Sequence, residues 1–181
     1  MKKNRSPFFD KIVPVNQRLL DYLKENISGG SLLDIGCGPK AYSTPFKEIC
    51  SKITTIDAWE KTNPDILADL EKISLLSLVN EKYDFILMID FIEHLDKTIG
   101  KKLIDECKRI CNKKIFVLTP LEQIWTDNRE NINDKSVWCY GNQYDLHKSI
   151  WSEHDFEEWS KITLKKGKGI QNYYIGYYEK K

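Results

Sequence analysis

Residues 32–40, with the sequence LLDIGCGPK, are the segment that is most informative about the fold. An apolar run that closes on Gly-x-Gly is typical of a strand followed by a turn where backbone approaches a ligand, because glycine has no Cβ to intrude. A second run, Ile53–Asp57, is rich in β-branched residues and ends on an acid. A carboxylate at the tip of the next strand can accept both hydroxyls of a ribose. The two segments therefore predict a nucleoside site at the carboxyl edge of a parallel sheet.

Two cofactor classes fit this loop. Gly36, Gly38 and Ala41 satisfy the G-x-G-x-x-A pattern of nicotinamide-binding Rossmann domains. Asp34 argues for the other class, because a carboxylate before the first glycine repels a pyrophosphate but attracts the ammonium of S-adenosylmethionine (SAM). Pro39 also removes one N–H from a phosphate-binding turn. The charges favour SAM, and an NAD-dependent oxidoreductase stays open as the alternative.

Strand and helix signals alternate along the chain. The expected strands are 31–35, 53–57, 65–67, 83–89 and 114–118, and the expected helices are 14–27, 41–50, 73–79 and 97–111. This alternation predicts a doubly wound, mostly parallel sheet of the α/β class. Ser152 and Asp155 resemble a capping box that opens a short helix. Segments 161–164 and 171–178 flank a glycine turn and predict a C-terminal antiparallel hairpin.

Composition limits the class of protein. The 181 residues suit a single domain over 1–181 with an N-terminal helical segment at 1–29, and the net charge of +1 gives no argument for nucleic acid or an anionic membrane. The five cysteines contain no CxxC pair, and the apolar surroundings of Cys107 and Cys111 predict core packing. Reduced thiols indicate a cytoplasmic protein. The most apolar stretch, 85–92, is too short to span a bilayer, so we expect no membrane segment.

Four segments, in this order, resemble motifs of the class I SAM-dependent methyltransferases, in particular the small-molecule branch that carries a Glu-His-Leu turn. They are 33–38, 56–57, 66–70 and 83–95. The resemblance implies a seven-stranded Rossmann-like sheet with SAM as the cofactor. It assigns the ribose to Asp57 and the adenine amino group to Asp69, and Lys40 departs from the motif by replacing its third glycine. The implied cofactor-binding residues are Asp34, Gly36, Cys37, Gly38, Asp57, Ala58, Asp69, Leu70 and Asp90.

Each assignment has a plainer alternative. Asp57 could be a solvated strand end, and Asp69 could cap the helix that follows it. Trp59 could stack on adenine or pack in the core. We assigned the acids near the loops to cofactor roles, so the sequence predicts no metal site.

Two histidines are the candidate catalytic residues. His94 follows the fourth strand, four residues after Asp90, and an imidazole titrates near neutral pH as a general base should. The alternative is that His94 orients the turn by hydrogen bonding. His147 is the second candidate, whereas His154 is expected on the surface.

Residues 121–151 form an aromatic insertion after the fifth strand. It contains Trp125, Trp138, Tyr140, Tyr144 and Trp151 among polar residues. A long loop there is a natural place for acceptor recognition, and the same aromatics could instead form a satellite core.

The absence of two motifs narrows the acceptor. The chain has no Asn/Asp-Pro-Pro-Tyr/Phe tetrapeptide of DNA amino methylation and no Pro-Cys pair for attack on cytosine. We therefore expect a methyltransferase acting on an O- or N-acceptor of small-molecule type, with nucleic acid disfavoured. The alternatives are a non-catalytic SAM-binding subunit of a partner, an RNA or protein methyltransferase that works through a partner, and the oxidoreductase. The acceptor and the oligomeric state are not predicted.

Overall fold

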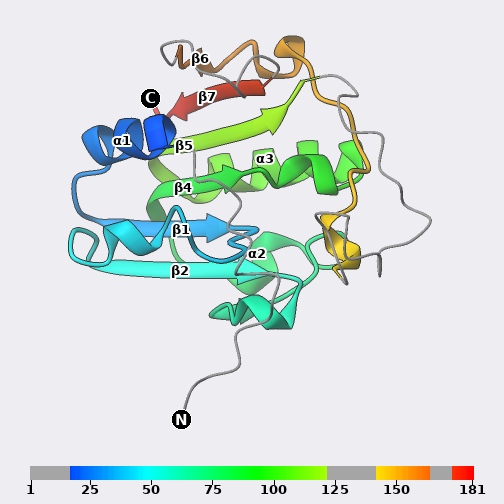
Figure 1. The fold of residues 1–181 in the computed structure, drawn as a ribbon, viewed down its shortest axis with the longest axis horizontal. Helices are drawn as coiled ribbons and strands as arrows, with labels where there is room; N and C mark the ends of the chain where they lie inside the picture. The colour runs from blue at the N-terminus through cyan, green and yellow to red at the C-terminus, as the bar shows by residue number, and fades with distance from the viewer. Residues whose placement is uncertain (1–16, 122–141, 164–172) are drawn as a thin grey trace.

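The computed structural model describes residues 17–121, 142–163 and 173–181. Its seven strands form one sheet in the order β3-β2-β1-β4-β5-β7-β6 (Figure 1). The strands are β1 Ser31–Ile35, β2 Lys52–Asp57, β3 Ile66–Leu67, β4 Tyr83–Ile89, β5 Cys111–Pro120, β6 Ser160–Lys161 and β7 Tyr173–Glu179. β7 runs antiparallel to both β5 and β6, and the other pairs are parallel. The predicted fold class is confirmed.

Alternate residues of the central strands pack on opposite faces of the sheet. Leu33, Ile86 and Val117 lie in one core cluster, together with side chains of α2 (Leu75–Leu78) and α3 (Lys97–Ile110). Leu32 and Phe116 lie in the other cluster, under α1 (Gln17–Asn26). Because both faces are covered, β4 is apolar almost throughout, as buried parallel strands usually are. This sandwich leaves the carboxyl ends of β1, β2 and β4 together at one edge.

The helix expected over residues 41–50 is wrong. The chain makes turns there, with only a 3-10 helix at Thr44–Phe46. Pro45 lies inside that helix and has no N–H to donate to a preceding turn. The helix expected at 73–79 shortens to α2, whereas the one expected at 97–111 is confirmed as α3. α3 begins at Asp96, whose side chain accepts a hydrogen bond from the Thr98 N–H.

The C-terminal part follows the prediction closely. The capping box of Ser152 and Asp155 is confirmed and opens a 3-10 helix at Glu153–Phe156. The antiparallel pair is also confirmed, but its first strand ends at Lys161, before the expected 164. The glycine turn between the strands lies outside the described residues, as does the part of the expected N-terminal helix before residue 17.

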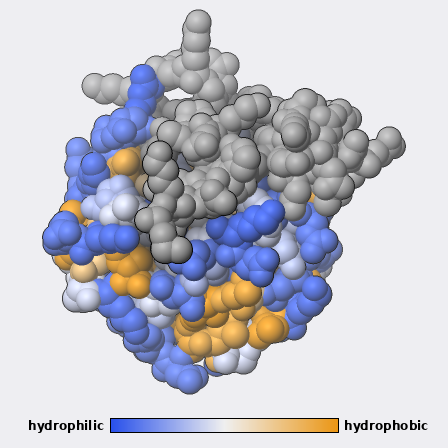
Figure 2. All heavy atoms as spheres, turned by 60° about the horizontal axis from the view of Figure 1, so that its bottom comes forward, coloured by the Kyte–Doolittle hydropathy of each residue, from blue (hydrophilic) through white to orange (hydrophobic). Residues whose placement is uncertain are grey.

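The surface is mostly hydrophilic in the view of Figure 2, with apolar side chains gathered on the side where the β2–β3 end of the sheet comes forward. Leu67 in the edge strand β3 is 57% exposed and Ile73 is 43% exposed. The cysteines at 37, 50, 107 and 111 are free and buried, so core packing of Cys107 and Cys111 is confirmed. Within the described ranges, no helix has the length and apolar character needed to cross a membrane.

Candidate functional site

The glycine loop is bonded to the end of the neighbouring strand. The N–H groups of Gly36 and Cys37 both donate to the carbonyl of Ile56, at 2.9 and 3.1 Å. Gly36 has φ +67°, and a Cβ built there would lie 2.0 Å from Cδ2 of Phe91. Only glycine fits this position without displacing the ring. Lys40 has φ 61°, the left-handed region, at the position where the family motif carries a third glycine.

Asp57 closes the loop from the tip of β2. Its Oδ2 accepts the Gly38 N–H at 2.9 Å, and its Oδ1 accepts the Trp59 N–H at 2.8 Å. Burial raises the pKa of Asp57, and these backbone hydrogen bonds work against that rise. The Cys37 thiol also donates to Oδ2, at 4.0 Å, and a ribose hydroxyl could replace this weak contact. Asp57 is thus an ordered part of the loop and not a solvated strand end.

Asp34 is a buried carboxylate with an unsatisfied oxygen. It is 4% exposed in the middle of the sheet, where β1 pairs with both β2 and β4. Its Oδ2 has no hydrogen-bond partner within the described residues. Burial raises the pKa of Asp34 to about 6, although the nearby Ser43 hydroxyl acts in the opposite direction. A cationic ligand group beside Asp34 would offset this cost.

A pocket opens beside the loop and collects six of the predicted site residues: Gly36, Asp57, Ala58, Asp69, Leu70 and His94. The structure adds Ile56, Ala68, Glu71, Phe91, Leu95, Tyr144 and Lys148 to its lining. The other five predicted residues do not line this pocket: Asp34, Cys37, Gly38, Asp90 and His147. The pocket has the mixed apolar and carboxylate lining that an adenosine requires.

Three predicted residues have structural roles as well. Asp69 lines the pocket and also accepts the Glu71 N–H at 3.0 Å, in a turn and not at the start of a helix; its contact with adenine stays a prediction. Trp59 is 8% exposed and is not part of the pocket lining, which favours core packing over adenine stacking. Burial raises the pKa of Cys37 to about 12, so its thiol stays protonated and is no nucleophile.

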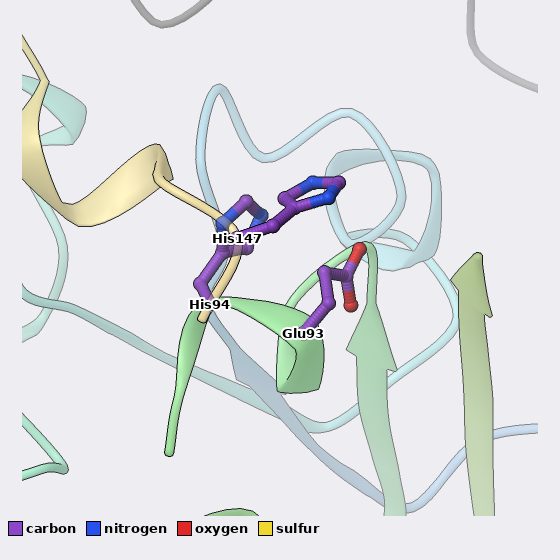
Figure 3. Close-up of side chains that lie close together, drawn as sticks. All are labelled: Glu93, His94 and His147. Atoms are coloured by element: carbon purple, nitrogen blue, oxygen red, sulfur yellow. The ribbon is translucent and has the colours of Figure 1, made fainter. Parts of the chain in front are cut away.

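The two candidate catalytic histidines come together at the end of the pocket. The ring centroids of His94 and His147 are 4.9 Å apart, with Glu93 next to them (Figure 3). Burial lowers the pKa of His94 to about 3, with His147 adding to the shift, so the imidazole is neutral. Glu93 is 1% exposed and accepts a hydrogen bond from Thr119 Oγ1 at 2.9 Å.

The segment that carries His147 is held against the turn after β4. The N–H groups of Lys148 and Ser149 donate to the Glu93 carbonyl at 2.8 and 3.1 Å. Lys148 also forms an ion pair with Glu71 on the other wall of the pocket. These contacts bring His147 next to His94, although the two histidines are 53 positions apart in the sequence.

Two residues of the site, Glu93 and Lys148, were not predicted as site residues, although Glu93 belongs to the Glu-His-Leu turn. No motif marks Lys148, whereas the aromatic character of the insertion, which includes Tyr144, pointed to its contact with the site. Trp151 from the same insertion is fully buried and stacks on Phe156 at 5.6 Å. The described part of the insertion therefore supplies both pocket lining and core. Trp125, Trp138 and Tyr140 lie outside the described residues.

Comparison with known proteins agrees with the geometry. A family model described as a methyltransferase domain matches residues 9–161. No curated protein matches the chain.

Among solved structures, the N-methyltransferase NodS from Bradyrhizobium japonicum WM9 has a TM-score of 0.60 at 13% identity, covering 99% of both chains. Magnesium protoporphyrin IX methyltransferase (ChlM) from Synechocystis PCC 6803, with SAH bound, has a TM-score of 0.61 at 13% identity, covering 91% of this chain and 81% of that one. A SAM-dependent methyltransferase from Clostridium acetobutylicum ATCC 824 has a TM-score of 0.62 at 10% identity, covering 93% and 94%. At these identities the likeness concerns the fold.

Proposed function

Because this chain belongs to the methyltransferase-domain family, we propose that it transfers a methyl group from SAM to a small-molecule O- or N-acceptor. The observation that carries the proposal is the pocket that joins Gly36 and Asp57 to His94. It connects a nucleoside-binding loop directly to groups able to act on an acceptor.

The residues around the loop fit SAM better than a dinucleotide. The buried, unsatisfied Oδ2 of Asp34 suits the ammonium of the methionine part and would repel a pyrophosphate. The absence of a Cβ at Gly36 lets Phe91 pack against the loop on the pocket wall, and Asp57 presents a carboxylate for the ribose hydroxyls. SAM supplies a methyl group on a sulfonium, which needs alignment more than activation. Two of the structural neighbours are described with SAH or as SAM-dependent, which supports the choice.

The acceptor end is formed by His94 and His147. His94 lines the pocket and His147 packs on it edge to face. Their position beside the nucleoside loop and against the 142–151 segment supports a role in meeting the acceptor. We propose that these two residues act on the acceptor and leave the binding of SAM to the loop. ChlM is described as acting on magnesium protoporphyrin IX, a small molecule, which supports that acceptor class.

The test is methyl transfer from labelled SAM to a panel of small alcohols, phenols and amines. Wild-type protein should methylate at least one class, and Asp57→Ala should abolish the transfer. His147→Ala should lower kcat by at least tenfold with little change in the KM for SAM. His154→Ala is the matched control, because His154 is 92% exposed and pairs only with Glu157 in the described chain. SAM binding without transfer to any acceptor would favour a non-catalytic SAM-binding subunit.

A further inference from the structure

We propose that Glu93, His94 and His147 bind a divalent transition-metal ion at the acceptor end of the pocket. One carboxylate and two imidazoles offer ligand atoms that all lie within 4.8 Å of one another. Figure 3 shows the two rings beside each other and the Glu93 carboxylate directed to the same region. Two histidines with one carboxylate leave coordination positions open, as in catalytic metal sites. The sequence had predicted no metal, because the acids near the loops were assigned to cofactor roles, and this proposal corrects that expectation.

The spacing is within reach of metal coordination. A tetrahedral ion bound at about 2.1 Å holds its ligand atoms roughly 3.4 Å apart. His147 is the partly exposed member of the three, so a small adjustment of its ring would bring the ligand atoms to that spacing while Glu93 keeps its hydrogen bond. The backbone itself is fixed, since Lys148 and Ser149 donate to the Glu93 carbonyl and keep the two segments together.

An outer contact orients one of the ligands. Thr119 Oγ1 donates to Glu93 Oε2 at 2.9 Å, and Thr119 is fully buried in β5. Ligating carboxylates in proteins are usually held by such hydrogen bonds. The bond fixes one oxygen of Glu93 and leaves the other for an ion.

The acidic side chains around the site are also compatible with a bound cation. Two further acids, Asp90 and Asp145, lie near Glu93. Among the described residues no cationic side chain pairs with these three acids, and Lys148 is already paired with Glu71. A divalent ion bound by Glu93 would supply positive charge beside them.

The proposed ion gives the acceptor end a specific chemistry. Its open positions would take an oxygen atom of the acceptor, whose hydroxyl proton would be released to solvent more readily on coordination. His94 and His147 would then act through the ion and not by taking the proton themselves. This role points to a hydroxyl acceptor and rests on the proposed function, whereas the metal site stands on the geometry alone.

The test is calorimetric titration of chelator-treated, dialysed full-length protein with Zn²⁺. We expect one ion per chain with a micromolar or tighter Kd. His147→Ala should weaken binding about 100-fold, and Thr119→Val, which keeps the shape of the side chain, about tenfold. His154→Ala should bind as the wild type does. Circular dichroism and the Tm of each variant identify any loss of fold, and His147→Gln provides a second variant at the partly exposed ligand.

Each outcome separates this inference from the proposed function. Equal Zn²⁺ affinity in the wild type and in both His147 variants would overturn the metal site, and so would the absence of stoichiometric binding to the wild type. A parallel titration with SAM tests the donor site independently. SAM binding without Zn²⁺ binding refutes only the metal, and Zn²⁺ binding without SAM binding refutes only the methyl donor.

Discussion

The affinity for SAM should fall when the pH is lowered from 7 to 5, and Asp34 should be the cause. Burial holds the pKa of Asp34 at about 6 in the ligand-free protein. At pH 5 only about one carboxylate in eleven is ionised, whereas at pH 7 about ten in eleven are. If the ammonium of SAM binds the ionised form, Kd rises about tenfold, or about 1.4 kcal/mol. The amino group of the ligand stays protonated over this range.

The assay is calorimetric titration at the two pH values with SAM and with adenosine. Adenosine lacks the amino-acid part, so it should show little of this pH dependence. The Asp34→Asn variant should bind SAM weakly at pH 7 and show a flat pH profile. A profile for Asp34→Asn as steep as that of the wild type would refute the assignment of the ammonium to Asp34.

Stability provides a second readout with a defined sign. The pKa of Asp34 is raised from its model-peptide value of 3.8 to about 6. The raised pKa therefore leaves the free energy of unfolding unchanged below about pH 4. It lowers that free energy progressively between pH 4 and 6 and by the full amount above pH 6. Asp34→Asn should raise the free energy of unfolding at pH 7 by about 3 kcal/mol relative to wild type, the cost of ionising a carboxyl whose pKa rises from 3.8 to about 6. No gain in stability at pH 7 would contradict the buried, ionised carboxylate.

Three further predictions concern the loop and the core. Gly36→Ala should abolish SAM binding, because the new Cβ would lie 2.0 Å from the Phe91 ring. A Cβ at Gly38 meets nothing within 4 Å, so Gly38→Ala should lower the free energy of unfolding only by the cost of the left-handed backbone, about 1 kcal/mol. Comparable losses of SAM binding in the two variants would argue against the steric explanation. The carboxylate of Asp155 loses solvation by burial, but hydrogen bonds from Lys97, Ser152 and Lys101 outweigh this and lower its pKa to about 2. Its stabilising contribution should be constant above about pH 4 and disappear as the pH falls to 2, and Asp155→Asn should remove this dependence in urea melts. Leu23 in α1 is fully buried, so Leu23→Ala should lower the free energy of unfolding by about 3 kcal/mol. Leu67 is 57% exposed, so Leu67→Ala should lower it by less than about 0.5 kcal/mol. Equal losses in the two variants would contradict the packing of α1 on the sheet.

The central strands could be predicted because local signals bound them on both sides. β1 lies between Gly29-Gly30 and Gly36, and β4 is an apolar run that ends at Asp90, so both strands were placed to the residue. The helix expected at 41–50 is absent, because Pro45 has no backbone N–H to donate, and the spacing of apolar residues carries no information about that donor. Local sequence thus determines an element only where no single residue breaks its hydrogen bonding.

The donor half of the site was predictable and the acceptor half was not. Gly36 and Asp57 belong to adjacent strand ends, and parallel pairing brings such ends together. His147 reaches Glu93 through hydrogen bonds from Lys148 and Ser149 that span more than fifty residues. No periodicity or motif in the sequence encodes that contact, which depends on how residues 142–151 lie on the turn after β4.

Binding of SAM at the glycine loop is tested most directly by calorimetric titration of the protein with SAM, with NAD in parallel. We expect a micromolar Kd for SAM, about −8 kcal/mol, and no heat from NAD. Asp57→Ala should abolish SAM binding, whereas Asp105→Ala, an exposed acid on α3, should leave it unchanged. Binding of NAD in place of SAM, or SAM binding that survives in Asp57→Ala, would contradict the claim that this loop is a methyl-donor site.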